Sequence, residues 1–431
     1  MIVDRQKVRL AVNLLLFYLG VVYIYIVHLQ PRPENEALGY RVLDCDIQYY
    51  VWILVYGVIT IALIPKKFDR PSSFFIMFHV LFVVFPFIVL PNIGSDSSQI
   101  SFFWMWLVLV FPIILISISN KIKTTVNILP SFNKLTSYPN SYLLVFLICV
   151  FVTCLAFLNA PLSSSFDIGT SYIRRLEGRD VYPTGSFTAY ANSIVMNGLG
   201  PLLAFWAGVN RNFKQFVIPI GIWLAYYYLL GIKSPLLMMT LSFFVGYHCS
   251  RDKLSKTFNY LVCILMVILL ASVIETVIFN YSYISDYFIR RAFTVPPFLI
   301  SVYGDFIAQN YYDGRWSFFS GFNSDIPISF VIGEQFMGKA GLNANTNAFV
   351  VAFSSGGFFL YGFICLILVL YYRIVDEVYK NRKSPSMLFC GFIFGILLIE
   401  QSATTALLSS GVIFVLLLSL ILSEQSECSC H

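Results

Sequence analysis

The chain alternates long apolar runs with short polar segments, and this alternation decides the class of structure that it predicts. A helix needs about 20 apolar residues to cross the hydrocarbon core of a bilayer. Such runs recur along the chain and predict an all-α polytopic membrane protein with about twelve spans, near residues 8–28, 47–65, 73–92, 100–119, 141–160, 188–209, 215–231, 235–249, 259–279, 346–371, 387–400 and 405–422. The hairpins at 215–249 and 387–422 contain the shortest of these runs.

The longest polar interruption lies between the ninth and tenth runs, at residues 280–345, and a second one lies at residues 161–187. Both segments mix charged residues with aromatic and apolar ones, a composition that suits the membrane interface. We therefore expect short amphipathic helices in these two loops, and we expect the loops to cap an active site. No internal repeat is visible, so residues 1–431 are predicted to form a single integral membrane domain.

Composition supports a membrane protein and removes the alternatives. The chain is 58% hydrophobic and 12% charged, whereas a soluble domain carries about 25% charged residues. The net charge of +6 is therefore interpreted loop by loop and is no indication of nucleic-acid binding. Most of the 28 Lys and Arg residues fall in alternate segments that begin with the N-terminus. The positive-inside rule then predicts that both termini are cytoplasmic.

Some cations fall on the predicted outer side against this bias, which suggests an anion there. Arg290 and Arg291 are adjacent in the large loop, and a guanidinium binds phosphate oxygens through two parallel hydrogen bonds. Neighbouring residues of a helix point about 100° apart. One Arg would meet a lipid pyrophosphate while the other pairs with a carboxylate such as Asp286. The alternative is that both are interfacial cations whose side chains snorkel to headgroups.

A second outer group contains Arg174, Arg175 and Arg179. Arg175 and Arg179 are four residues apart and share a helix face. Anion binding is one interpretation of this group. The other is that Glu177 and Asp180 neutralise it.

Lys233 lies in the short turn between two apolar runs, flanked by Gly231 and Pro235. A cation between two spans is costly unless it reaches the surface or a cavity. We favour a functional role for Lys233. The alternative is an ordinary hairpin turn that happens to contain one Lys.

Two kinds of polar residue remain open to interpretation. Asn345 and Asn347 precede the tenth run; their amides suit sugar hydroxyls, although N-terminal capping of the helix accounts for one of them equally well. The outer carboxylates do not select a general base by spacing. Glu400 follows an apolar run directly, so partial burial would raise its pKa and suit it to acid–base chemistry.

The chain contains no P-loop, no His-Glu-x-x-His and no Gly-x-Gly-x-x-Gly before a helix. Each of these motifs brings a nucleotide or a metal to a reaction centre. We therefore expect no cofactor and no metal. ATP-driven transport and metal-dependent transfer from nucleotide sugars are disfavoured.

The chain resembles the Wzy-type polymerases of bacterial surface polysaccharide, which join oligosaccharide repeat units. The resemblance rests on three segments: Gly231-Ile-Lys-Ser-Pro235, Arg290-Arg-Ala-Phe-Thr-Val-Pro-Pro297, and Asn345-Thr-Asn-Ala-Phe349 followed by Ser355-Gly-Gly-Phe-Phe-Leu-Tyr-Gly362. The topology extends over the whole chain and the motifs over about a quarter of it. Lys233 stands where the family often has Arg.

This resemblance implies a metal-independent glycosyltransferase that polymerises undecaprenyl-pyrophosphate-linked repeat units of an O-antigen or capsular polysaccharide. Its site would face the periplasm from the bacterial inner membrane. By analogy the pyrophosphates would be held by Arg290, Arg291, Arg174, Arg175 and Lys233. Glu334 or Asp305 would activate the acceptor hydroxyl. The implied partners are the lipid-linked glycan, membrane lipid, a chain-length regulator and a flippase. The related O-antigen ligases use a His in the large loop, and this loop has none.

A different class of function is a flippase for lipid-linked oligosaccharides or another polysaccharide transporter. Such transporters usually have internal repeats and sites near the middle of the bilayer. Here the runs contain almost no charge and the outer cations gather at one face. That arrangement favours chemistry at a surface over passage through the membrane. A non-catalytic assembly partner would not need paired outer arginines.

Overall fold

The computed structural model describes residues 5–65, 68–94, 99–122, 141–183, 185–249, 254–338 and 341–422. This part of the chain is almost entirely helical. Seven helical segments are long and apolar enough to cross a membrane. They are Val8–Leu29, Ser72–Val89, Phe102–Ser119, Ser141–Leu158, Phe213–Leu230, Lys256–Phe279 and Ala348–Arg382. The prediction of an all-α membrane protein is therefore confirmed, while the number of crossings stays a prediction.

Each of the twelve predicted runs contains helix, and the boundaries agree closely. The first six runs correspond to α1 (Arg5–Ile24) with η1 (Tyr25–Leu29), α3 (Ile47–Leu63), α4 (Ser72–His79) with η2 (Val80–Val84) and α5 (Phe85–Val89), α6 (Gln99–Ser119), α7 (Ser141–Leu158), and α9 (Phe187–Ile194) with η3 (Val195–Leu199) and α10 (Gly200–Val209). The last six correspond to α11 (Phe213–Leu230), α12 (Ser234–Cys249), α13 (Leu254–Phe279), α16 (Ala348–Arg382), α17 (Pro385–Leu397), and η5 (Thr405–Ser409) with α18 (Val412–Ile421).

Local sequence explains where several helices begin and end. The Asp46 carboxylate accepts the Tyr49 N–H at 2.7 Å and caps α3, as an N-cap side chain does. Gly231 has φ of +63° and closes α11 in the left-handed conformation that glycine adopts without strain. The wide π-helical turns η2 and η3 each precede a proline, Pro86 or Pro201. Proline lacks the N–H and crowds the preceding turn, which a wider turn relieves.

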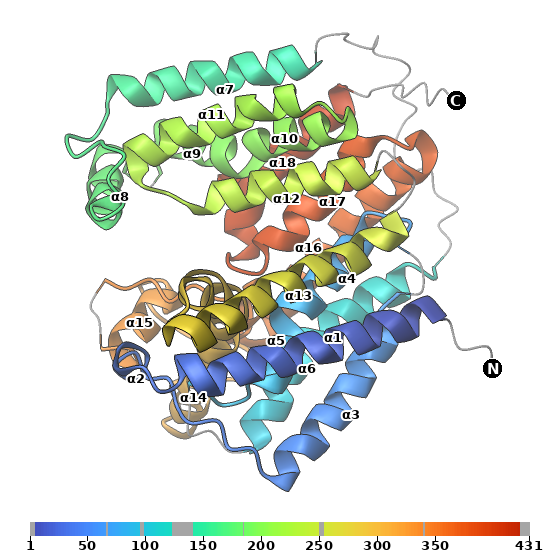
Figure 1. Cartoon of the computed structure of the whole chain (residues 1–431), viewed down its shortest axis with the longest axis vertical. Helices are drawn as coiled ribbons and strands as arrows, with labels where there is room; N and C mark the ends of the chain where they lie inside the picture. Colours follow the sequence, from blue (N-terminus) through green and yellow to red (C-terminus); the bar gives the residue numbers. More distant parts are fainter. Residues whose placement is uncertain are drawn as a thin grey trace.

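The helices form two groups with α4, α16 and α17 between them (Figure 1). One group contains α7 and α9–α12, and the other contains α1, α3, α5, α6, α13 and α14 (Val295–Tyr312). α10 and α12 pack closely because glycines meet backbone: a Cβ on Gly208 would lie 2.2 Å from the Phe243 carbonyl oxygen, and one on Gly246 would lie 2.2 Å from that of Phe205. Small residues at such a contact let two helix backbones approach.

The segments predicted to lie outside gather at one end of the molecule. α2 (Pro33–Glu36), α8 (Ser171–Val181) and α15 (Ile328–Gln335) all lie at the left of Figure 1. The large loop contains short helices as predicted, η4 (Ser285–Thr294) and α15, but η4 runs directly into α14, where Phe298 to Val302 are buried. That sequence is apolar on every side, so it packs into the core rather than along an interface.

The loop also inserts into α16. Gly357 has φ of +55° and ψ of −153°, which breaks the helix in its first third. A two-stranded hairpin, β1 (Trp316–Ser317) paired with β2 (Gly321–Phe322), fits against the break. The N–H of Phe358 donates to the Phe318 carbonyl at 2.7 Å. Glycine lets the hairpin approach this closely, since a Cβ on Gly357 would lie 2.6 Å from the Phe318 carbonyl oxygen.

Candidate active site

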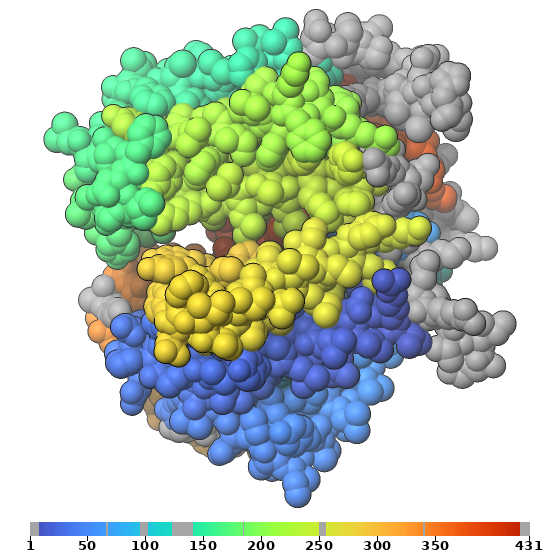
Figure 2. All heavy atoms as spheres, in the orientation of Figure 1, coloured from blue at the N-terminus to red at the C-terminus, as the bar shows by residue number. Residues whose placement is uncertain are grey.

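A hollow opens between the two helix groups at the end where the predicted outer segments gather. Figure 2 shows it between the green surface of α8, α11 and α12 and the yellow surface of α13 and η4, with red atoms of the C-terminal part of the chain at its back. The predicted cations come from the two sides of this hollow, α8 with the Gly231 turn on one and η4 on the other.

Arg174 is fixed inside the protein and does not line the hollow freely. Its side chain is 0% exposed. Its Nη1 donates to the Ser165 hydroxyl at 2.7 Å, the Asp167 carbonyl at 2.8 Å and the Thr170 hydroxyl at 2.9 Å. The guanidinium carbon also lies 5.4 Å from the centre of the Tyr227 ring. Arg174 therefore holds the 165–170 segment onto α8, and its predicted role in pyrophosphate binding is better assigned to its neighbour.

Arg175 points elsewhere, as neighbouring helix positions must. Its Nη2 donates to the Gly231 carbonyl at 3.3 Å, which joins α8 to the turn that contains Lys233. A Cβ on Gly231 would lie 2.6 Å from the Ser171 carbonyl oxygen, so only glycine lets the two segments approach this closely. Lys233 is exposed and forms no ion pair among the described residues. The second and third predicted groups are thus brought together.

Arg291 connects this side to η4. Burial lowers the pKa of Arg175, and the positive charges of Arg291 and Arg179 lower it further. Arg291 is therefore close enough to repel Arg175 although 116 positions separate them in the chain. Two guanidinium groups held near each other, one of them exposed, repel, and an anion beside them would offset this repulsion.

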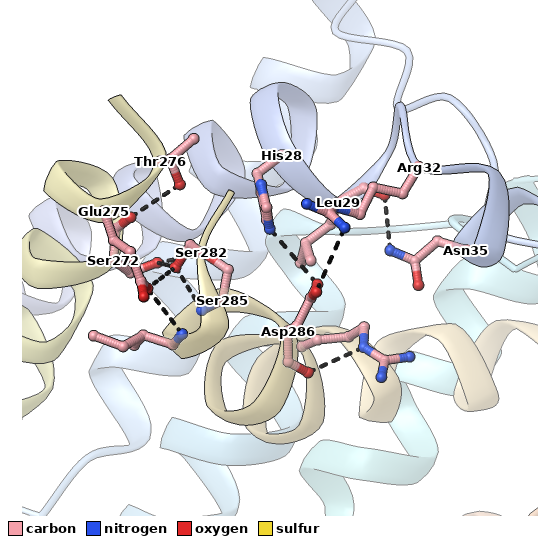
Figure 3. A network of polar contacts seen from close by, with 12 residues as sticks. His28, Leu29, Arg32, Asn35, Ser272, Glu275, Thr276, Ser282, Ser285 and Asp286 are labelled. Carbon is pink, nitrogen blue, oxygen red and sulfur yellow. Dashed lines mark hydrogen bonds and ion pairs between the residues drawn. The ribbon is translucent and has the colours of Figure 1, made fainter. Parts of the chain in front are cut away.

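The predicted pairing of Arg290 or Arg291 with the Asp286 carboxylate is wrong. Arg290 Nε donates at 3.2 Å to the backbone carbonyl of Asp286 instead. The Asp286 carboxylate lies 3.6 Å from His28 Nε2 and 3.7 Å from Arg32 Nη1 (Figure 3). Arg32 also stacks over the Tyr281 ring at 4.2 Å. Because Asp286 is occupied by the first outer segment, neither arginine of the pair is neutralised by it.

This Asp286 cluster was missed by sequence reasoning. A hydrogen bond to Asp286 and partial burial raise the pKa of Tyr281 to about 12, so the phenol stays protonated. Ser282 and Ser285, in the same turn, bond to Ser272 of α13 (Figure 3). The cluster anchors the first turn of η4 to η1 and α13. In the chain, Asp286 is 254 positions from Arg32 and 258 from His28, and no local pattern indicates these contacts.

Glu400 is the carboxylate that the structure brings to the arginines. It follows α17, and its side chain is exposed. Many protein atoms nevertheless surround the carboxyl group and desolvate it. Burial raises the pKa of Glu400, and the charge of Arg291 opposes that shift. Arg291 therefore lies within electrostatic range of both Arg175 and Glu400, and the three side chains come from three separate parts of the chain.

The two asparagines have different roles. Asn347 is 1% exposed; its Oδ1 accepts the Phe349 N–H at 3.0 Å, and its Nδ2 donates to the Leu398 carbonyl at 3.1 Å. It caps α16, so the capping interpretation is confirmed and sugar contact is contradicted for this residue. Asn345 is exposed on the same segment. The Ala348 N–H donates to the Leu398 carbonyl at 3.0 Å, which joins this segment to the turn that contains Glu400.

The carboxylates first chosen as bases lie in other surroundings. Asp305 is on α14 and lines a cavity of about 370 Å³ together with Arg41 and Phe298. Glu334 is exposed on α15 and makes no hydrogen bond or ion pair among the described residues. Among the residues that the structure describes, no group of three His, Cys, Asp or Glu side chains is placed to hold a metal.

Comparison of the chain with protein-family models, with curated proteins and with solved structures found no match.

Proposed function

We propose that the chain is a membrane glycosyltransferase that polymerises polyprenyl-pyrophosphate-linked oligosaccharide repeat units. The observation that carries the proposal is that Arg291 lies within electrostatic range of both Arg175 and Glu400, while Arg175 bonds to the turn that contains Lys233. The cations suit a departing pyrophosphate and the carboxylate suits the proton that an attacking hydroxyl loses. Resemblance to the Wzy-type polymerases identifies the substrate class.

In the proposed reaction the terminal sugar hydroxyl of one lipid-linked unit attacks the anomeric carbon of the glycan on a second lipid. A new C–O bond forms, and the bond from that carbon to the pyrophosphate oxygen breaks. Glu400 takes the hydroxyl proton. Arg175, Arg291 and Lys233 stabilise the negative charge that grows on the leaving pyrophosphate, which is the larger part of such catalysis. Asn345, on the segment beside this turn, hydrogen-bonds to a sugar hydroxyl in this proposal.

Glu400 replaces Glu334 and Asp305 as the proposed base. A base must have a pKa near the working pH so that it is ionised yet still able to hold a proton. Burial moves the pKa of Glu400 in that direction. The orientation that we propose places this end of the molecule at the outer face of a bacterial inner membrane.

The decisive test uses the purified full-length protein with polyprenyl-pyrophosphate-linked repeat units, followed by gel sizing of the glycan. We expect a ladder of polymer without added metal or nucleotide. Single units alone, from a protein that is folded and monodisperse, would contradict the proposal. A deletion strain provides the second arm: unpolymerised units on the outer face support a polymerase, whereas units that accumulate on the cytoplasmic side indicate the flippase alternative.

A further inference from the structure

A second charged cavity lies at the opposite end of α16 from Glu400. Its volume is about 390 Å³, and its lining includes Arg70, Ser119, Arg373, Asp376, Lys380 and Lys383. The 35 residues of α16 would extend roughly 50 Å at 1.5 Å per residue. The cavity is therefore far from the hollow that contains Arg291, and the proposed glycosyl transfer makes no use of it.

The carboxylates around this cavity are already engaged by the protein. Asp376 accepts the Ser72 N–H at 2.9 Å and the Ser72 hydroxyl at 2.6 Å, which caps the start of α4. Asp69 lies 3.4 Å from Arg70 Nε. Glu377 accepts a hydrogen bond of 3.4 Å from Asn381. The acidic side chains are therefore engaged in hydrogen bonds within the protein or in one ion pair.

The donors around the cavity are less well satisfied. Arg373 and Lys380 form no ion pair among the described residues, and Lys383 lies 5.2 Å from the centre of the Tyr379 ring. The Ser119 hydroxyl is buried without a hydrogen-bond partner in the described part of the chain, and the residue is 8% exposed. A buried hydroxyl and two unpaired cations at one polar cavity leave donors for an oxygen-rich anion.

The position of the cavity indicates where such an anion would come from. Ser72, Ser119 and Arg382 are the terminal residues of three of the apolar segments long enough to span a membrane. The cavity is thus at the depth where lipid headgroups meet the protein. Basic pockets between helices at the cytoplasmic side hold lipid phosphates, and the charge pattern predicts this side to be cytoplasmic.

We propose that this cavity binds a phosphate group, supplied by an anionic phospholipid headgroup or by free phosphate. Arg373 and Lys380 supply the charge and Ser119 supplies a hydrogen bond. Binding there would join α4, α6 and α16 at the end remote from the reaction. The proposal does not depend on the glycosyltransferase activity.

Native mass spectrometry of the purified full chain tests this proposal, with phosphatidylglycerol and phosphatidylcholine as the probes. The wild-type protein should retain phosphatidylglycerol in preference. Replacing a cation that contacts phosphate removes a charge-assisted hydrogen bond, so Arg373→Gln and Lys380→Gln should each weaken retention about tenfold. The matched control is Arg382→Gln, on the same helix end, whose guanidinium donates to the Leu420 carbonyl at 3.4 Å and lies outside the cavity lining. This control should retain lipid like the wild type.

A second arm separates the two sources of phosphate. Free phosphate is the ligand if inorganic phosphate binds the wild type and binds Lys380→Gln more weakly, while phosphatidylglycerol is retained no better than phosphatidylcholine. Ser119→Ala is a small change that leaves the charges in place, and it should weaken binding about threefold. It also serves if a charge variant fails to fold. Equal lipid and phosphate binding by wild type, Ser119→Ala and Lys380→Gln would overturn the proposal.

Discussion

Two segments of the molecule, α8 and η4, each carry a pair of adjacent arginines beside the same hollow, and the two pairs are built differently. In α8, Arg174 is wholly buried and held by three oxygen acceptors. In η4, Arg290 is half-buried, and among the described residues it bonds only to the Asp286 carbonyl one turn earlier. Of the second arginines, Arg175 bonds instead to the Gly231 carbonyl of another segment, and Arg291 is exposed.

The comparison separates arginines that build the protein from arginines that act on a ligand. Neighbouring residues differ by about 100° around a helix, so one member of a pair can anchor the helix while the other faces the hollow. The α8 anchor is the stronger because it ties a separate loop in place. Substitutions within each pair should therefore have opposite consequences for stability and for activity.

The largest effect is expected from Arg291→Gln. It removes a guanidinium within range of Arg175 and Glu400, and loss of one stabilising donor for developing charge should lower the polymerisation rate roughly 300-fold. Polymer formed per minute by the purified protein is the measurement. Arg290→Gln is the matched control and should retain most activity. Equal losses in the two variants would remove the distinction within the η4 pair.

Glu400→Gln should come next, with a loss of about 100-fold, the usual range for removal of a general base. Burial raises the pKa of Glu400 above its ordinary value of 4.5. The wild-type rate should therefore rise with pH as this carboxyl loses its proton at a pH above 4.5. The variant should lose that rise. Persistence of the same acidic limb in Glu400→Gln would exclude this residue as the base.

The effect of Glu400→Gln on stability is a separate prediction, and its direction follows from the pKa of the carboxyl. A carboxyl whose pKa is raised by folding binds its proton more tightly when folded, so ionisation at neutral pH opposes folding. Glu400→Gln should thus unfold at the same temperature as the wild type or at a higher one at pH 7. A large decrease would mean that its activity loss reflects damage to the fold.

Arg174→Ala tests the other half of the comparison. It leaves the acceptors of a buried cation without their donor, which should cost about 2 kcal/mol of stability. Thermal unfolding monitored by size exclusion measures this. Arg175→Ala, its neighbour and control, should unfold like the wild type yet form less polymer. If Arg175→Ala is the less stable of the two, the assignment within the α8 pair is reversed.

The smallest effect is expected from Asp286→Asn. It keeps the size of the side chain but removes the charge that pairs with Arg32 and His28. His28 is 3% exposed, and Asp286 and Arg32 keep 17% and 22% of their side-chain surface exposed. The asparagine amide keeps an oxygen acceptor for both partners, so we expect the fold to persist. We expect about a threefold loss of rate because η4, and Arg291 with it, is positioned less firmly. No change in rate would show that η4 is held by its buried apolar side chains alone.

Helix positions were predictable from sequence because hydrophobic run length is a local property. All twelve runs contain helix, and Asn347 caps α16 as its position before an apolar run allowed. The η4–α14 segment was misjudged because its charges occupy its first turns while its later turns are apolar. The prediction gave more weight to the charged residues of the loop than to the apolar residues in the second half of this segment.

The sequence identified the candidate cations of the site, but it did not show which of them anchor a helix and which face the hollow. Sequence placed Arg174, Arg175, Arg290, Arg291 and Lys233 on one side of a membrane because they depart from the charge bias. Which member of each pair faces the hollow depends on helix rotation, which distant contacts such as Arg175 with Gly231 fix. The approach of Glu400 to Arg291, on which its proposed role as base depends, arises for the same reason only through tertiary packing.

The hairpin seated at the break in α16 also has a consequence for the order of assembly. Residues within a membrane cannot leave backbone groups unbonded without a cost of several kcal/mol, and Gly357 interrupts the bonding of α16. The hairpin that supplies the Phe318 carbonyl to Phe358 precedes α16 in the chain. During synthesis from the N-terminus, this partner strand has therefore already emerged when the broken helix enters the bilayer. The chain order allows α16 to be inserted with its backbone complement in place.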